Sequence, residues 1–144
     1  MDVASSLGLV YGYGAGLDMT RRDLQFEARD KGRPWDTGKN FAFSAPLGPI
    51  RPVEGHGHAD KGRIRLTANG AVRQEADLAD MIWSPAEVVS YLSHLERLFP
   101  GDLIYTGTPA GVGPVVPGDV IEVAIDGLDP LKVTIAEREP SFRG

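Results

Sequence analysis

Short segments in which apolar and polar residues alternate occupy the second half of the chain, a pattern typical of strands buried on one face. Residues 63–68 and 71–76 alternate in this way on either side of Asn69-Gly70. Because an Asn-Gly pair favours a type I′ turn, these two segments predict a β-hairpin. Residues 119–125 and 131–135 alternate as well and predict two more strands.

An apolar run at residues 7–17 predicts a buried strand, with glycine at positions 8, 12, 14 and 16. Alternate glycines leave one face of a strand without side chains, so another backbone or a ligand is expected to pack closely there. Residues 102–105 predict a further strand, which leads into Thr106-Gly107-Thr108-Pro109.

Two helices are expected between these segments. Thr20 followed by Asp23 resembles a capping box, so the first helix is expected to begin near Thr20 and to run to Lys31. Ser84, Pro85 and Glu87 form a second capping box, which opens a helix that ends at Pro100-Gly101. Its expected apolar stripe consists of Val88, Tyr91, Leu92, Leu95 and Leu98.

Composition narrows the class of protein. The chain has 144 residues, of which 42% are hydrophobic and 24% charged, enough for one domain with a core. The 18 glycines and 11 prolines indicate many turns between short strands. We therefore expect one mainly β domain with two helices, of the α+β class, built as a curled mixed sheet or β-roll. The tail from Glu137 is polar and is expected to be loose.

Charge and apolar patterning exclude several partners. The net charge of −5 and the scattered lysines and arginines offer no surface for nucleic acid. No apolar run reaches the length of a membrane span, and no signal pattern opens the chain. The chain has no cysteine, which excludes disulfides and thiolate metal sites. A cytoplasmic location is expected.

The first candidate functional residues lie at the end of the apolar run. Asp18, Arg22 and Gln25 are spaced so that a helical path starting early enough would project all three to one side. Such a set can bind a metal ion and an anionic substrate. The same spacing is also typical of an Asp–Arg pair on a solvated helix surface.

Two further segments can bind an anion. Lys39, between Gly38 and Asn40, is either an exposed lysine or an ammonium group aimed at an oxyanion or carboxylate, with Phe41 and Phe43 packed behind it. The Thr106–Thr108 turn is either an anion cradle or a tight loop that needs glycine for its geometry. His56 and His58 are better explained by a mobile surface loop than by a metal site. An aspartate without cysteine or histidine partners favours a hard cation, Mg²⁺, Mn²⁺ or Ca²⁺.

Four sequence blocks stand in order along the chain. They are Leu-Asp-Met-Thr-Arg-Arg-Asp-Leu-Gln at 17–25, Gly38-Lys39-Asn40-Phe41 after Lys31-Gly32-Arg33-Pro34-Trp35, Asn69-Gly70 with Arg73-Gln74 and Asp80-Met81-Ile82, and Pro100-Gly101-Asp102 through the Thr-Gly-Thr-Pro-Ala-Gly-Val-Gly run at 106–113. Together these blocks resemble the fumarylacetoacetate hydrolase family, and they look most similar to its acylpyruvase and fumarylpyruvate hydrolase branch. The resemblance covers about residues 7 to 135 and implies the C-terminal catalytic domain of the family.

The resemblance implies a metal-dependent hydrolase that cleaves a carbon–carbon bond in acylpyruvates and other β-diketo acids, such as fumarylpyruvate. By match, Asp18 binds Mg²⁺ or Mn²⁺, with Ca²⁺ possible, and Lys39 holds developing negative charge. Arg22 and Gln25 match substrate-binding positions, and Thr108 matches a threonine that contacts the carboxylate of a small anionic 2-oxo acid.

The chain departs from the family in one respect. The family's upstream half supplies a Glu-x-Glu pair of metal ligands and a His and a Glu that activate water. His56 and His58 do not match that histidine, and Glu137-Arg138-Glu139 stands in the wrong place. We therefore expect residues 1–144 to be a single catalytic domain truncated at its N-terminus, weakly active or inactive alone unless another chain supplies the missing half.

Two alternatives stay open for the activity. One is a dicarboxylic dienol isomerase or decarboxylase of the same family, and the other is an inactive remnant that retains an anion-binding site. The resemblance also implies a homodimer, with the hairpin at Asn69-Gly70 and the segment Asp80-Met81-Ile82-Trp83 as candidate interface elements.

Overall fold

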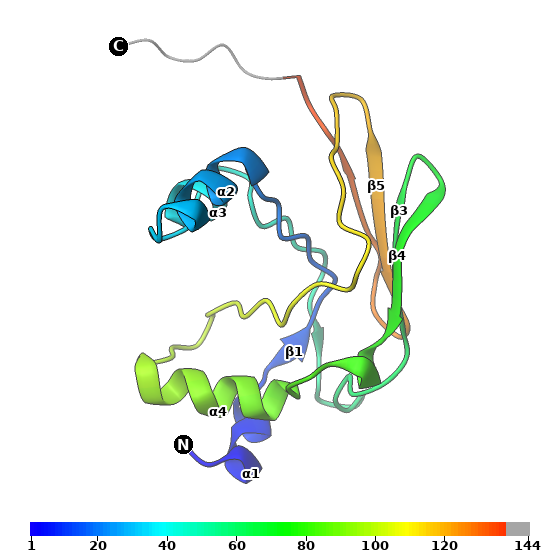
Figure 1. Cartoon of the computed structure of the whole chain (residues 1–144). Helices are drawn as coiled ribbons and strands as arrows, with labels where there is room; N and C mark the ends of the chain where they lie inside the picture. The colour runs from blue at the N-terminus through cyan, green and yellow to red at the C-terminus, as the bar shows by residue number, and fades with distance from the viewer. Residues whose placement is uncertain (138–144) are drawn as a thin grey trace.

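The structure, a computed structural model, describes residues 1–137 and has an α+β fold, as the sequence predicts. A four-stranded sheet forms one side of the molecule, and α2 and α3 lie together away from it (Figure 1). Along the chain the elements are α1 (Val3–Ser6), the 3-10 helix η1 (Leu7–Leu9), β1 (Gly12–Tyr13), α2 (Arg22–Asp30), α3 (Asp36–Lys39), β2 (Arg51–Pro52), β3 (Arg63–Ala68), β4 (Ala71–Asp77), the 3-10 helix η2 (Leu78–Asp80), α4 (Pro85–Leu95), β5 (Val120–Ile125) and β6 (Leu131–Thr134). The tail that is expected to be loose begins at Glu137, and all of it after that residue lies outside the described residues.

The main sheet has the order β4-β3-β5-β6. Every strand pair in residues 1–137 is antiparallel, so this part of the chain contains no mixed sheet. The predicted hairpin of β3 and β4 is confirmed, and its turn has positive φ at Asn69 (51°) and Gly70 (80°), as a type I′ turn requires. The Asn69 side chain also accepts from the Val120 N–H at 2.9 Å, which ties the turn to β5.

The core lies where the N-terminal segment crosses the sheet. Its buried members are Ala15, Leu17, Ile121, Val123 and Leu131. Ile121 and Val123 alternate along β5, and Leu131 lies on β6, in agreement with the strands predicted there. Ala15 and Leu17 come from the segment between β1 and α2, so burial of their side chains holds that segment on the sheet.

The apolar run at residues 7–17 does not form one long strand, so that prediction is wrong. Only Gly12–Tyr13 pairs as a strand, with β2, and a single bridge joins Gly16 to Leu47. The facing segment contains Pro46 and Pro49, which have no backbone N–H and cannot extend a hydrogen-bonded ladder.

The close approach predicted for the glycines does occur. A Cβ at Gly12 would collide with the Arg51 carbonyl oxygen, and one at Gly14 would lie 3.2 Å from the Pro49 carbonyl oxygen. A Cβ at Gly8, in contrast, would meet open space. The missing side chains at Gly12 and Gly14 therefore admit the neighbouring backbone.

The first predicted helix is confirmed, but its predicted cap is wrong. Helix α2 begins at Arg22 rather than near Thr20, and Arg21 at its N-cap makes no side-chain capping bond. The Thr20 hydroxyl instead donates to the Asp18 carbonyl, at 3.4 Å, because residue 20 still lies outside the helix. The helix ends at Asp30, one residue before the predicted end.

The second capping box is confirmed. The Ser84 N–H donates to Glu87 Oε2 at 2.7 Å, and the Glu87 N–H donates to Ser84 Oγ at 3.3 Å. Helix α4 ends at Leu95, because Glu96 is already extended with φ −139° and ψ 153°. The predicted end at Pro100-Gly101 is thus about a turn too late.

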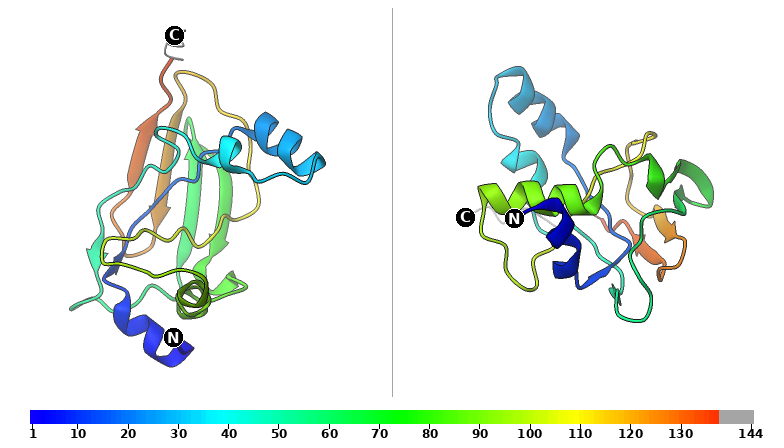
Figure 2. Two further views of the ribbon diagram at one scale, coloured as in Figure 1. Left: turned by 90° about the vertical axis from the view of Figure 1, so that its left-hand side faces the viewer. Right: turned by 90° about the horizontal axis from the view of Figure 1, so that it is seen from below.

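The predicted apolar stripe of α4 is wrong in part. Tyr91 and Leu95 are 53% and 61% exposed. The buried residues Ala86, Val89 and Ser90 form the covered face, and the Ser90 hydroxyl donates to the Met1 carbonyl at 2.7 Å. Figures 1 and 2 show α1 beside α4. Helix α1 therefore covers a small-residue face that the apolar pattern does not reveal.

Two other local predictions are corrected. Residues 102–105 form no strand, because no strand in the described part of the chain pairs with them. Phe43 does not pack behind Lys39, since it is 89% exposed at a left-handed φ of 63°. Phe41 lies instead under the Arg21 guanidinium, 4.4 Å from its ring centroid. Among the helices of residues 1–137, none has the length and apolar character needed to cross a membrane.

The cap of α4 makes stability depend on pH. The hydrogen bonds from the Ser84 backbone and hydroxyl hold the pKa of Glu87 below its ordinary value of 4.5. A carboxylate with a depressed folded pKa stabilises the fold above its unfolded pKa, and this contribution is lost as the pH falls through the folded pKa. Urea unfolding of wild type and Glu87→Gln should therefore show a stability difference that shrinks from about pH 7 to about pH 3.

Glu96→Gln, at the other end of α4 and outside the capping box, is the matched control for the loss of one carboxylate. A wild-type advantage over Glu87→Gln that stays constant across this range would contradict the capping account.

Candidate functional site

An ion pair between Asp18 and Lys39 is the centre of the candidate site. The Lys39 ammonium lies 2.9 Å from Asp18 Oδ1 and 2.8 Å from Oδ2, and it also donates to Thr20 Oγ1 at 3.0 Å. The two side chains are 33% (Lys39) and 43% (Asp18) exposed. A carboxylate and an ammonium group that are half covered but still reachable can exchange each other for ligands of opposite charge.

The backbone on either side of Asp18 is fixed. Leu17 is 6% exposed in the core, and its N–H donates to the Pro46 carbonyl at 2.9 Å. The Met19 N–H donates to the Ser44 carbonyl at 2.8 Å. With its two neighbours held by the core and by these bonds, the Asp18 side chain is presented on the opposite, exposed side of the segment.

Lys39 reaches Asp18 because α3 packs closely on α2. Gly38 is buried, and its carbonyl accepts from the Arg21 N–H at 2.9 Å. A Cβ at Gly38 would lie 3.0 Å from the Gln25 backbone nitrogen, so the absence of a side chain at Gly38 admits α2 here. The α2–α3 contact therefore places the last residue of α3 over the Asp18 segment.

Arg22 and Gln25 form a second pair. Arg22 Nη1 donates to Gln25 Oε1 at 2.7 Å, and Gln25 is 6% exposed. Since α2 begins at Arg22, Asp18 does not lie on the helix. Its carboxylate accepts from Lys39, and its backbone carbonyl accepts from the Thr20 hydroxyl, but neither bonds to Arg22. Of the predicted triplet, Arg22 and Gln25 are thus hydrogen-bonded to each other, whereas Asp18 pairs with Lys39 instead.

Tyr105 also belongs to this site, and no motif in the sequence predicts it. Its hydroxyl donates to the Ala45 carbonyl at 2.9 Å and to the Pro46 carbonyl at 3.2 Å, and its ring lies against Gly16. Burial, and to a lesser degree the charge of Asp18, raises the pKa of Tyr105 above its ordinary value. Gly16, in the apolar run, is the signal in the sequence: it indicates that another group approaches closely, but it does not identify that group as Tyr105.

Thr108 is not joined to the ion pair. It is exposed, and in the described part of the chain no hydrogen bond links its hydroxyl to Asp18, Lys39 or Arg22. The end of its turn is held elsewhere, because Gln74 Nε2 donates to the Pro109 carbonyl at 2.7 Å. The turn therefore lies between Tyr105 on one side and β4 on the other.

The histidine loop stands apart from these groups. His58 Nδ1 is 2.8 Å from the Tyr13 hydroxyl, and His56 Nδ1 is 3.1 Å from the Glu54 carbonyl oxygen. Both histidines are exposed, in agreement with the surface loop predicted for them.

The Asp18 carboxylate is of the type that a hard divalent cation prefers as a ligand. Both oxygens of Asp18 already bind a positive group, so this carboxylate fits as one ligand. Residues 1–137 contain no cluster of three or more His, Cys, Asp or Glu side chains that could hold a metal ion. Within these residues, Asp18 therefore has no two further His, Cys, Asp or Glu side chains beside it with which to hold a metal ion.

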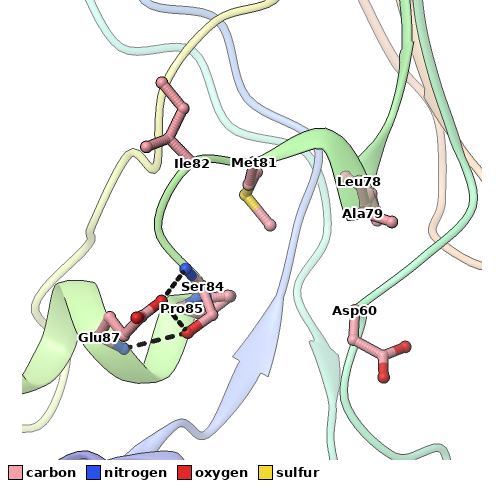
Figure 3. A pocket seen from close by; sticks show the side chains of 8 residues that line it. All are labelled: Asp60, Leu78, Ala79, Met81, Ile82, Ser84, Pro85 and Glu87. Carbon is pink, nitrogen blue, oxygen red and sulfur yellow. Dashed lines mark hydrogen bonds between the residues drawn. The ribbon is translucent and has the colours of Figure 1, made fainter.

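An open pocket at the start of α4 is separate from this site. Figure 3 shows its lining residues together with the Ser84–Glu87 capping bonds, and none of the predicted site residues lines it. The lining residues are Asp60, Leu78, Ala79, Met81, Ile82, Ser84, Pro85 and Glu87.

Comparison with known proteins gives consistent results. A family model described as fumarylacetoacetate (FAA) hydrolase C-terminal matches residues 2–136. The fumarylpyruvate hydrolase of Ralstonia sp is 48% identical over 131 residues, which are 91% of this chain and 68% of that protein. The mitochondrial oxaloacetate tautomerase FAHD1 of Homo sapiens is 40% identical over 139 residues, which are 96% of this chain and 62% of that protein.

A solved structure, the fumarylpyruvate hydrolase of Pseudomonas aeruginosa in complex with Mn²⁺ and pyruvate, superposes with a TM-score of 0.94 at 48% identity. The alignment covers 96% of this chain and 59% of that one. This chain thus spans between 59% and 68% of the lengths of these three relatives.

The exposure of the Asp18–Lys39 pair limits how much it contributes to the free energy of unfolding. Half-exposed ion pairs contribute about 0.2–1 kcal/mol, because water screens them. A double-mutant cycle with Asp18→Asn and Lys39→Met, followed by urea unfolding, should give a coupling energy in that range. The cross-strand pair Glu122–Lys132, 2.7 Å apart, is the control and should give a similar value. A coupling above about 3 kcal/mol at Asp18–Lys39 would show a structural rather than a ligand-binding pair.

Proposed function

The chain belongs to the fumarylacetoacetate hydrolase family, and on this basis we propose that the Asp18–Lys39 site serves the metal-dependent hydrolysis of an acylpyruvate such as fumarylpyruvate. The observation that carries the proposal is the position of Lys39, whose ammonium binds both oxygens of Asp18 at 2.8 and 2.9 Å. The relative that is 48% identical is named a fumarylpyruvate hydrolase, which supports the choice of substrate.

Each residue has a proposed role. A divalent cation at Asp18, Mg²⁺ or Mn²⁺, supplies Lewis-acid stabilisation of the pyruvate enolate that leaves when the carbon–carbon bond breaks. Lys39, no longer needed by Asp18, holds negative charge on the reacting oxygen. Arg22 and Gln25 orient the substrate, since Arg22 has further N–H groups besides the one that Gln25 accepts. The Thr108 hydroxyl donates to the substrate carboxylate.

Hydrolysis also needs an acceptor for the proton of the attacking water. In the described residues, no His or Glu is hydrogen-bonded to Asp18 or Lys39. A general base is typically worth about a hundredfold or more in rate. We therefore propose that residues 1–144 form one catalytic domain that needs further groups, so that turnover by this chain alone is weak.

A second candidate is the tautomerisation of a 2-oxo dicarboxylic acid. It rests on the 40% identity to a protein named oxaloacetate tautomerase. Both reactions pass through an enolate next to a 2-oxo acid, so the same cation and the same lysine would serve either one. Only hydrolysis releases pyruvate from an acylpyruvate, and this product separates the two.

A homodimer in the cytoplasm is the remaining part of the proposal. The candidate interface is the segment from Asp80 to Trp83, together with the hairpin at Asn69-Gly70. Ile82 is 96% exposed, and Trp83, 47% exposed, packs edge-on against Tyr91 with ring centroids 5.2 Å apart. Apolar side chains exposed to this degree support a covered surface in the assembled protein.

The activity is tested by the Mn²⁺-dependent loss of ultraviolet absorbance from fumarylpyruvate and acetylpyruvate, with released pyruvate measured in parallel. Weak turnover that needs the metal is expected. Asp18→Asn should abolish it, and Lys39→Met should lower it about a hundredfold or more, as is typical when one charge-stabilising group is lost. Lys39→Met should still bind Mn²⁺, because the ammonium that competes for Asp18 is gone.

Glu122→Gln and Lys132→Met, which separate an ion pair on the sheet surface, are the matched controls and should not change turnover. Turnover that is indifferent to Asp18 and Lys39 would contradict the proposed site. Metal-dependent conversion of oxaloacetate without pyruvate release from an acylpyruvate would favour the tautomerase.

The proposed dimer is tested by light scattering coupled to size exclusion. The wild type should have twice the mass of one chain, and Ile82→Glu should weaken the dimer about tenfold or more, as the loss of a central apolar contact does. Phe43→Glu changes a residue of similar exposure (89%) and is the control. A wild type that stays monomeric at high concentration would contradict the dimer.

A further inference from the structure

Tyr105 joins three segments that are far apart in the sequence. Its hydroxyl donates to the carbonyls of Ala45 and Pro46, at 2.9 and 3.2 Å. The Pro46 carbonyl also accepts from the Leu17 N–H at 2.9 Å, directly before Asp18. One carbonyl is therefore shared between Tyr105 and the backbone that presents Asp18.

The tyrosine ring makes the second contact with the same segment. A Cβ at Gly16 would lie 2.7 Å from Tyr105 Cε1 and 3.3 Å from Cζ, so only glycine admits the ring here. Tyr105 is 37% exposed, and its covered face rests on this backbone. Hydroxyl and ring together fix Tyr105 relative to the residues just before Asp18.

The residues that follow Tyr105 are the Thr106–Thr108 turn. On its far side the Pro109 carbonyl accepts from Gln74 Nε2 at 2.7 Å, and Gln74 is 9% exposed on β4. Gly107 has φ 117° with open space around it. The three residues 106–108 thus lie between Tyr105 and Pro109, which are both held by hydrogen bonds. These two fixed points determine where the Thr108 hydroxyl lies.

We propose that Tyr105 is a positioning residue, which holds the Thr106–Thr108 turn at a fixed place relative to Asp18 so that one small 2-oxo acid can reach both. The inference rests on the proposed function, because it assumes that the turn and Asp18 bind the same molecule. Fixing the turn before binding lowers the entropy lost when substrate is bound at two points.

The role predicts a separation of two affinities. Without the hydroxyl, the turn is free to move while the Asp18 carboxylate is unchanged. Binding of Mn²⁺ alone should then be unaffected, and binding of pyruvate in the presence of Mn²⁺ should weaken. The loss of a net hydrogen bond corresponds to about tenfold in the dissociation constant of pyruvate.

The test compares Tyr105→Phe with wild type. Mn²⁺ binding and pyruvate binding are measured by paramagnetic relaxation, and exchange of the Thr106, Gly107 and Thr108 amides is measured without ligands. Tyr91→Phe is the matched control, since the Tyr91 hydroxyl has no hydrogen-bond partner in residues 1–137 and the residue is exposed on α4. Gly16→Ala is a second variant, which keeps the hydroxyl but displaces the ring.

Tyr105→Phe and Gly16→Ala should weaken pyruvate about tenfold, speed amide exchange in the turn and leave Mn²⁺ binding within about twofold, whereas Tyr91→Phe should change none of these. If wild type binds pyruvate and Tyr105→Phe binds it equally well, the positioning role is overturned while the proposed function stands. If wild type binds neither Mn²⁺ nor pyruvate, the proposed function fails and the positioning role fails with it.

Discussion

Burial of Leu17 and Ala15 against β5 and β6 is the constraint on which the candidate site depends. Leu17 is in the core, and the neighbouring backbone groups of residues 17 and 19 bond to Pro46 and Ser44, so Asp18 has one direction in which to point. Lys39 and Tyr105 then approach that segment from different parts of the chain, at places where Gly38 and Gly16 leave room. The Asp18–Lys39 ion pair is thus a consequence of the packing of Leu17 in the core, on the opposite side of the segment 17–19.

The sequence predicted the elements whose signals are local. The Asn69-Gly70 turn with its two strands, the Ser84–Glu87 cap and strands β5 and β6 all follow from patterns a few residues long. The prediction of a long strand at residues 7–17 was wrong because strand pairing there depends on prolines in a partner segment that is distant in the sequence. The predicted apolar stripe on α4 was wrong in part because α1 covers small residues of this helix. An apolar pattern does not indicate that Ala86 or Ser90 is buried.

The site was predicted to a similar extent. Asp18, Lys39, Arg22 and Gln25 were identified from residue type and family resemblance, and the structure joins them into two pairs rather than one cluster. Tyr105 was missed because nothing near it in the sequence shows that its ring faces Gly16. The roles of these five residues and of Thr108 are proposals. Thr108 is exposed and is not hydrogen-bonded to the ion pair in the described residues.

The central claim is that Asp18 exchanges Lys39 for a divalent cation when a 2-oxo acid binds. Anomalous diffraction at the manganese edge, from crystals of this chain grown with Mn²⁺ and pyruvate, tests it most directly. The account predicts a manganese peak beside the Asp18 carboxylate, pyruvate next to it, and Lys39 turned away from Asp18. A manganese peak elsewhere, with the Asp18–Lys39 pair still at hydrogen-bond distance, would contradict the account.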